Sequence, residues 1–294
     1  MSDALAVDKR LVRRSFEQAA ATYDAAAVLQ NEVCRRMLAR LDYIKLEPAT
    51  ILDAGSGTGN AVAGLLARYP RARVIALDLA LAMARRARAR RPWWRGLLEW
   101  SAPRLVAVCG DIEHLPLAPA CAGMVWSNLA IQWSNEPQRA FAEMHRVLAP
   151  GGLLLFSSFG PDTLKELRAA FQSVDRHTHV HRFTDMHDVG DMLIACGFAD
   201  PVMDMEVVTL TYADVRELMR DLKAIGAHNV TRGRCATLAG KSLLASVARN
   251  YEPARREGRL PATFEVIYGH AWKPQPRTSP TGHPVIDIKP RSGA

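Results

Sequence analysis

The chain has 294 residues, of which 49% are hydrophobic, and a formal net charge of +8. This length suits one large α/β domain, and no stretch approaches the roughly 20 uninterrupted apolar residues that cross a bilayer. The N-terminus lacks the apolar segment of a signal peptide, so we expect a soluble, cytoplasmic protein with no membrane partner. The five cysteines are scattered, which favours free thiols over disulfides and argues against a metal site.

Short apolar runs alternate with helical patterns from Thr50 onward, and this order predicts a parallel sheet with helices on both faces. The strands are expected at residues 50–55, 72–78, 104–111, 122–128 and 153–159. The helices between them are expected at residues 61–70, 79–91 and 137–150. Five parallel strands in this order indicate a nucleotide-binding type of fold.

The regular alternation of strand and helix ends at Gly160, and beyond it more helices than strands are expected. Strands are expected at residues 201–212 and 262–272, and helices at residues 161–174, 184–198, 213–227 and 240–251. Pro161 is expected near the first turn of its helix, and Thr184 is expected to cap the next one. The helices form two insertions around the sixth strand, where they could cover a pocket at the strand ends.

A glycine-rich stretch, DAGSGTGN at residues 53–60, follows the first strand. A dinucleotide-binding loop has the pattern G-x-G-x-x-G, whereas here Asn60 stands where the third glycine would be. A phosphate-binding P-loop is excluded more firmly, because no Lys-Ser or Lys-Thr pair follows the glycines. The stretch alone could also be an ordinary turn.

Acidic residues follow three successive strands. Asp53 could attract the ammonium group of an amino acid, and Asp78 could accept hydrogen bonds from two ribose hydroxyls. Asp111 could accept a hydrogen bond from an adenine amino group, with Ile112 as an apolar plate for the ring, although Asp111 taken alone is more often a helix cap. Taken in order, these positions describe an adenosine bound beside an amino acid.

With these features, residues 50–160 resemble the class I S-adenosylmethionine-dependent methyltransferases. The resemblance implies a Rossmann-like, seven-stranded, mostly parallel sheet with helical lid insertions around the sixth strand. It implies that S-adenosylmethionine is bound by Asp53, Gly55, Gly57, Gly59, Asp78, Leu79, Asp111, Ile112 and Asn128.

The same resemblance divides the chain into four segments. Residues 1–46 would form a helical segment over the cofactor site, and residues 47–160 the cofactor-binding core. Residues 161–272 would hold the rest of the sheet with the lid insertions. Residues 273–294 are rich in proline and small polar residues, so we expect them to be disordered.

A closer resemblance lies in blocks spread from residue 16 to residue 272, of which SNLAIQW (127–133) and LKAIGA (222–227) are the most specific. They are similar to the malonyl-acyl-carrier-protein O-methyltransferases of biotin synthesis. This implies methyl transfer to the free carboxyl of a malonyl thioester on acyl carrier protein, or on coenzyme A. A carboxylate is already ionised at pH 7, so no general base is required and no catalytic residue is assigned.

The acceptor would instead need hydrogen-bond donors and cations around its carboxylate. The candidates are Tyr23, Trp133, Arg182, Lys223 and Arg234. Arg182 is the preferred one, because it precedes an apolar residue, Phe183, in an expected lid. Each of these residues could instead be a packing or surface residue.

Positive charge is concentrated between Gly64 and Arg104, a stretch that contains ten arginines and only two acidic residues. Acyl carrier proteins are typically acidic, so the patch from Arg85 to Arg95 is a candidate docking surface for the carrier. The alternative is an ordinary solvated helix face.

Two other functions remain open on the sequence alone. The first is methylation of a quinone precursor or another small acid by the same fold. The second is a noncatalytic protein that binds S-adenosylmethionine. Nucleic acid is not expected as a partner, because SNLAIQW stands where base-modifying methyltransferases often carry a Pro-Pro-aromatic motif.

Overall fold

The computed structural model describes residues 6–90, 103–172, 174, 177–227 and 241–276. Its strands are β1 (Thr50–Ala54), β2 (Arg73–Asp78), β3 (Leu105–Cys109), β4 (Ala122–Asn128), β5 (Leu148–Phe159), β6 (Ala199–Tyr212) and β7 (Leu260–Trp272). They form one seven-stranded sheet in the order β3-β2-β1-β4-β5-β7-β6, in which β7 runs antiparallel to both neighbours. The expected mostly parallel, Rossmann-like sheet is confirmed.

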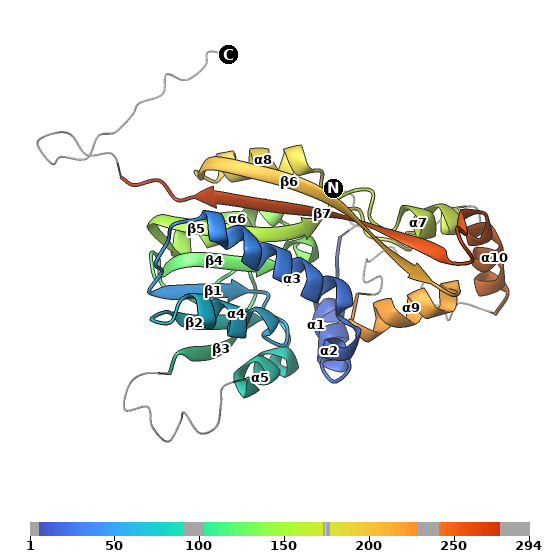
Figure 1. Ribbon diagram of the computed structural model, residues 1–294, viewed down its shortest axis with the longest axis horizontal. Helices are drawn as coiled ribbons and strands as arrows, with labels where there is room; N and C mark the ends of the chain where they lie inside the picture. The colour runs from blue at the N-terminus through green and yellow to red at the C-terminus, as the bar shows by residue number, and fades with distance from the viewer. Residues whose placement is uncertain (1–5, 91–102, 173, 175–176, 228–240, 277–294) are drawn as a thin grey trace, which may run out of the picture.

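The helices lie around this sheet (Figure 1). They are α1 (Lys9–Ala19), α2 (Tyr23–Ala26), α3 (Val28–Arg40), α4 (Asn60–Arg68), α5 (Leu81–Ala89), α6 (Pro137–Val147), α7 (Lys165–Gln172), α8 (Met186–Ala195), α9 (Val215–Ala224) and α10 (Lys241–Tyr251), with short 3-10 turns η2 (Leu41–Tyr43), η4 (Ile131–Trp133) and η5 (Glu252–Ala254). None of the helices in the described residues is long and apolar enough to span a membrane.

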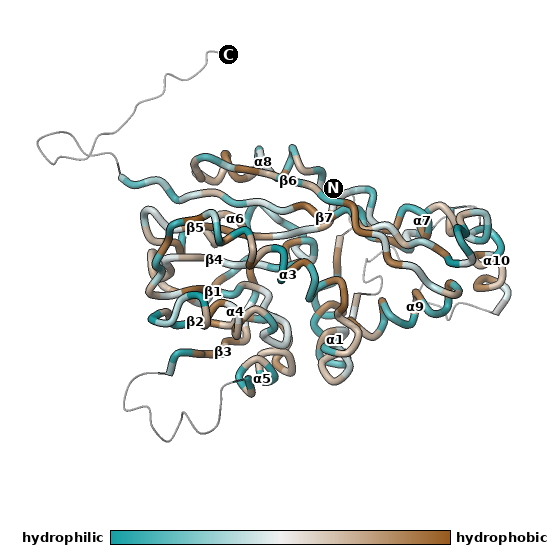
Figure 2. The backbone as a smooth tube through the Cα atoms, in the orientation of Figure 1, coloured by the Kyte–Doolittle hydropathy of each residue, from teal (hydrophilic) through white to brown (hydrophobic). Residues whose placement is uncertain are grey.

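The central strands are buried because helices cover both faces of the sheet. Ile51 and Leu52 are adjacent on β1 and point to opposite faces, yet both are fully buried in separate clusters. Hydrophobic residues are accordingly concentrated in the strands, while α9 alternates between hydrophobic and hydrophilic residues (Figure 2). The continuous apolar runs of the sequence therefore correspond to strands buried on two sides.

Strands β6 and β7 extend past the other strands to the side of the molecule where α7, α9 and α10 lie (Figure 1). Helices α7 and α8 are inserted before β6, and α9 and α10 follow it. The expected pair of helical insertions around the sixth strand is confirmed. Helices α7, α9 and α10 lie with α1 and α2 on the side toward which β1 and β4 point, where an open α/β sheet binds its ligands, whereas α8 packs against α6 and β6 (Figure 1).

Two expected helix starts are wrong. Helix α7 begins at Lys165 rather than near Pro161, because the preceding backbone bonds to β7: the amide of Leu164 donates to the Thr263 carbonyl at 2.6 Å. Helix α8 is capped by Asp185 rather than Thr184, since the Asp185 carboxylate accepts a hydrogen bond from the His187 amide at 2.8 Å.

The proline-rich tail is described only at its start. Lys273 donates from Nζ to the carbonyls of His145 and Leu148, each at 2.8 Å, and so attaches the end of β7 to the end of α6. Residues 277–294, which carry most of the expected disorder, lie outside the described residues.

Candidate active site

The glycine loop turns tightly at the end of β1. Gly55, Gly57 and Gly59 all have positive φ, at 80°, 55° and 82°, a conformation that favours glycine. The amides of Gly55 and Ser56 both donate to the Leu77 carbonyl at the end of β2. A Cβ on Gly55 would meet the Cβ of Ala130 at 2.2 Å, so the loop passes the chain after β4 at a distance only glycine permits. This opens a cradle at the carboxyl ends of β1 and β4.

Asp78, at the end of β2, is held in place by two backbone amides. It accepts from Gly57 through Oδ2 and from Ala80 through Oδ1, each at 2.8 Å. Burial raises the pKa of Asp78 to about 6, although these two amides lower it. Each carboxylate oxygen keeps a further lone pair, so Asp78 can accept the two hydroxyls of a ribose.

Asp53 lies on β1 directly before the loop and is 2% exposed, and its Oδ2 has no hydrogen-bond partner in the described part of the chain. Burial and the charge of Asp78 raise the pKa of Asp53 to about 8. A buried carboxylate without a compensating partner is costly, and a cation near the loop would reduce that cost. The pair of acids therefore fits a positively charged ligand.

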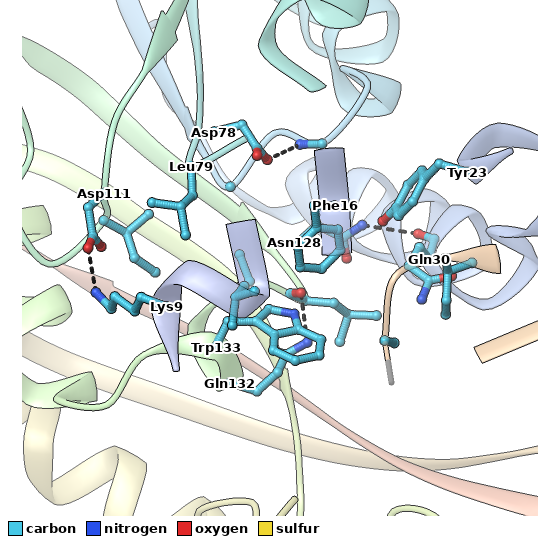
Figure 3. A pocket seen from close by; sticks show the side chains of 18 of the residues that line it. Lys9, Phe16, Tyr23, Gln30, Asp78, Leu79, Asp111, Asn128, Gln132 and Trp133 are labelled. Atoms are coloured by element: carbon cyan, nitrogen blue, oxygen red, sulfur yellow. Dashed lines mark hydrogen bonds and ion pairs between the residues drawn. The ribbon is translucent and has the colours of Figure 1, made fainter. Parts of the chain in front are cut away.

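Asp111 and Ile112 lie at the other end of the cradle, after β3. Asp111 accepts from Lys9 Nζ at 2.5 Å, and Lys9 also pairs with the buried Glu113 (Figure 3). Burial alone would raise the pKa of Glu113, but hydrogen bonds from Lys9 and Ser134 hold it below its usual value. Lys9 thus fixes the carboxylate that the sequence assigns to the adenine.

Helices α1 and α2 cover this cradle. Phe16 packs edge-on against Trp133 of η4, with ring centroids 5.3 Å apart. Tyr23 faces Gly57, with its ring 3.7 Å from where a Cβ would stand. Burial, followed by the charges of Asp78 and Asp24, raises the pKa of Tyr23, so its hydroxyl stays protonated and can donate.

These groups line a hollow with about 810 Å³ of empty space, part of it open to solvent, here called the loop cavity (Figure 3). Its wall includes the predicted residues Gly55, Gly57, Asp78, Leu79, Asp111, Ile112, Asn128, Tyr23 and Trp133. Asp53 and Gly59 are not on this wall. Asp53 is buried in β1, and Gly59 approaches α5, where a Cβ would meet the Cα of Ala87 at 3.1 Å.

A second cavity of about 950 Å³, the apolar cavity, lies between α7, α9 and the residues before α8. Its wall is mostly hydrophobic, including Leu167 and Phe171 of α7 and Met219 of α9, with the buried His181 among its polar groups. Both cavities share Gln30, Gln132, Trp133, Phe159, Ile225 and Ala227. The two spaces therefore adjoin at this common wall.

Of the predicted cations, Arg182 and Lys223 line neither cavity. Arg182 is exposed and lines a separate hollow, and Lys223 is exposed on α9. Arg234 lies outside the described residues. The neighbour of Arg182, His181, is the residue that turns inward and contacts Trp133, with ring centroids 5.4 Å apart.

Sequence reasoning missed several residues that line the loop cavity, among them Lys9, Phe16, Gln30 and Gln132. Lys9 and Phe16 reach the site only because α1 folds back over the sheet, and no local pattern signals that contact. Gln132 lies inside the SNLAIQW block, and Ile225 and Ala227, which also line the loop cavity, lie inside LKAIGA, so these two blocks were the available signals.

The fold and the two adjoining cavities define a class I S-adenosylmethionine-dependent methyltransferase. Residues 52–156 match the model of the methyltransferase domain family. The YcgJ protein of Bacillus subtilis shares the fold, with a TM-score of 0.58 and 14% identity over 83% of this chain and 99% of that one. So does the phosphoethanolamine N-methyltransferase 2 of Haemonchus contortus, solved with S-adenosylhomocysteine (TM-score 0.50, 18% identity, 88% and 58% covered).

The chain belongs to the malonyl-acyl-carrier-protein O-methyltransferases. It is 56% identical to a protein of that name from Gallionella capsiferriformans, over 95% of this chain and 96% of the relative. It is 54% identical to one from Methylovorus sp., over 100% and 99% of the two chains. The expected resemblance is confirmed over nearly the whole length, and the methyl donor is S-adenosylmethionine.

Proposed function

We infer that the protein transfers a methyl group from S-adenosylmethionine to the free carboxyl of a malonyl thioester on acyl carrier protein. The product is the malonyl methyl ester that starts pimeloyl and biotin synthesis. The observation that carries this assignment is the common wall between the loop cavity and the apolar cavity. A methyl donor bound in the loop cavity and a methyl acceptor bound in the apolar cavity would meet at this common wall.

S-adenosylmethionine supplies an electrophilic methyl group on a positively charged sulfur. Gly55 and Gly57 leave room for its amino acid end, Asp78 accepts from its ribose, and Asp111 with Ile112 receives its adenine. These assignments rest on the wall of the loop cavity and on the two buried acids beside it. The substrate carboxylate already carries the charge it needs, so the wall has only to orient it and exclude water.

Two donors at the common wall suit the substrate carboxylate, namely Gln30 and Trp133. Neither the amide nitrogen of Gln30 nor the indole nitrogen of Trp133 takes part in a hydrogen bond with the described residues, and Gln30 Oε1 is buried without a partner. A terminal amide can rotate to present either oxygen or NH₂ to the cavity. We assign the carboxylate to these two groups, and Tyr23 stays a candidate next to them.

The apolar cavity favours the product over the substrate. Burying a carboxylate among hydrophobic side chains is costly, whereas burying a methyl ester is not. The same wall strips water from the attacking oxygen, which increases its reactivity. Esterification therefore removes the one charge that the cavity disfavours.

The function is tested by methyl transfer from labelled donor to malonyl-carrier protein, malonyl-coenzyme A and a quinone precursor, measured in parallel. We expect the two malonyl thioesters to be methylated on the carboxyl and the quinone precursor to be inactive. Methylation of the quinone precursor alone would refute the assignment, and so would donor binding without transfer to any acceptor.

Replacing Gln30 with leucine is expected to lower kcat/KM for the malonyl acceptor about 10-fold, since a hydrogen bond to a charged group contributes about 1.5–3 kcal/mol. The side chain keeps its approximate volume, and the Gln30 carbonyl still accepts from Asn128 at 3.0 Å. Steady-state kinetics with saturating donor measure the effect. Gln138→Leu, at an exposed position on α6, is the matched control. Equal losses in the two variants would remove Gln30 from the acceptor site.

The proposed docking surface for the carrier on α5 is only partly described. Arg85, Arg86 and Arg88 are exposed there, whereas Arg91 and Arg95 lie outside the described residues. Arg90 is already engaged, because its Nε donates to the Thr58 carbonyl of the glycine loop at 2.5 Å. Helix α5 contributes nothing to the wall of the apolar cavity. The patch stays a prediction, tested by the salt dependence of carrier binding after charge reversal at Arg85 and Arg88.

A further inference from the structure

A third hollow, of about 770 Å³, adjoins the apolar cavity and is here called the arginine hollow. It is lined by Arg168, Phe171, Gln172, His177, Thr178, His179, Val180 and Arg182. Three of these residues, Phe171, His179 and Val180, also line the apolar cavity. The rings of Phe171 and His179 stack at 3.8 Å between centroids and form part of the wall between the two spaces.

Two guanidinium groups face the arginine hollow without an acidic partner in the described residues. Arg168 is held by the carbonyls of Pro161 and Thr163, each at 2.9 Å, while its Nε is buried and has no hydrogen-bond partner. Arg182 is exposed and forms no ion pair or hydrogen bond with the described residues. Asp162, whose charge acts on Arg168, is paired with Lys165 at 2.9 Å.

The two cations line the same hollow. Burial lowers the pKa of Arg168, the charge of Asp162 opposes this, and the neighbouring charge of Arg182 lowers the pKa further. Two guanidinium groups that line one hollow repel one another, and an anion bound between them relieves this repulsion. A phosphate suits such a pair, because its several oxygens can accept from both planar groups at once.

We propose that the arginine hollow binds the phosphate of a phosphopantetheine arm through Arg168 and Arg182. The arm would pass the Phe171–His179 stack into the apolar cavity and deliver its thioester toward the common wall with the loop cavity. This rests on the proposed function, because a malonyl thioester on either carrier protein or coenzyme A hangs from the same phosphorylated arm. It also gives Arg182 a role, at the opposite end of the substrate from the carboxylate.

The test compares acceptors that differ only in the phosphate. Wild type and Arg182→Gln are assayed with malonyl-4′-phosphopantetheine and with malonyl-pantetheine, and then with malonyl-carrier protein and malonyl-coenzyme A. We expect Arg182→Gln to raise KM about 10-fold for every acceptor that carries the phosphate and to leave KM for malonyl-pantetheine unchanged. Arg182→Lys should recover part of the loss, and Arg139→Gln, at an exposed position on α6, should show none.

Three results would overturn the proposal. The first is an equal loss with malonyl-pantetheine, which would mean a structural role. The second is a loss confined to the carrier protein, which would mean contact with the carrier's surface rather than with the arm. The third is no loss at all.

Calorimetric binding of 4′-phosphopantetheine against pantetheine separates this proposal from the methyl-transfer assignment. Preferential binding of the phosphorylated compound that is lost in Arg182→Gln supports the site even if malonyl acceptors prove inactive. Equal binding of the two compounds would refute the site even if the protein methylates malonyl thioesters.

Discussion

Replacing Gly55 with alanine is expected to abolish S-adenosylmethionine binding and to lower the free energy of unfolding by about 3 kcal/mol. The new methyl group would stand 2.2 Å from the Cβ of Ala130, and φ at this position is 80°. Both the close contact and the left-handed backbone oppose a side chain, so the loop must move away from the chain after β4. Urea unfolding and calorimetric titration with the cofactor measure the two effects.

Two further variants separate the contact from the backbone conformation. Gly258→Ala has a nearly equal φ of 77° but nothing within 4 Å, so it should cost only about 1 kcal/mol. Ala130→Gly introduced into the Gly55→Ala protein removes the contact and should restore part of the cofactor affinity. If Gly258→Ala is as damaging as Gly55→Ala, or if Ala130→Gly restores nothing, the close approach is not what demands glycine here.

Asp53→Asn is expected to weaken cofactor binding about 10-fold at pH 8.5, yet to stabilise the ligand-free protein by about 2 kcal/mol at that pH. Burial raises the pKa of Asp53 to about 8, whereas an unfolded aspartate titrates near pH 4. Between these pH values the folded state holds a proton that the unfolded state has lost, so the wild type loses stability as the pH rises from about 4 to about 8. The amide has no such loss.

The pH profiles of binding and stability test this account together. Cofactor affinity of the wild type should rise as the pH increases through 8, because a cation favours the ionised carboxylate, and this rise should be absent in Asp53→Asn. Asp188→Asn, at an exposed position on α8, is the control and should change neither profile. A variant that binds the cofactor as tightly as wild type at pH 8.5 would show that the charge of Asp53 does not reach the ligand.

The core of the fold was predictable because its signals are local. The parallel strands are short apolar runs, and Asp78 and Asp111 lie in the loop cavity because neighbouring strands end at one edge of the sheet. Asn60 is instructive: it breaks the dinucleotide pattern, and in the structure its amide bonds to Asn31 of α3 at 2.6 Å. Asn60, which stands where a dinucleotide-binding loop has glycine, therefore connects the glycine loop to the N-terminal helices.

The acceptor side was not predictable in the same way. Whether His181 or Arg182 turns inward depends on the packing of Trp133 and Phe183 around that segment, and the order of the residues does not reveal it. Lys9 is 102 residues from Asp111 in the chain, and only the folded N-terminal helices bring the two together. Long-range contacts of this kind carry no sequence periodicity, so Lys9 could not be predicted to line the loop cavity.

The place of β7 in the sheet sets the order in which the chain can fold during synthesis. Strand β7 is the last of the described strands to be made, yet it lies between β5 and β6, and β6 pairs with no other strand in the described part of the chain. Until residue 272 has left the ribosome, β5 therefore keeps one open edge and the 14 residues of β6 have no strand to pair with. Open edges of this length invite aggregation, so premature termination within β7 should leave an insoluble product rather than a smaller working enzyme.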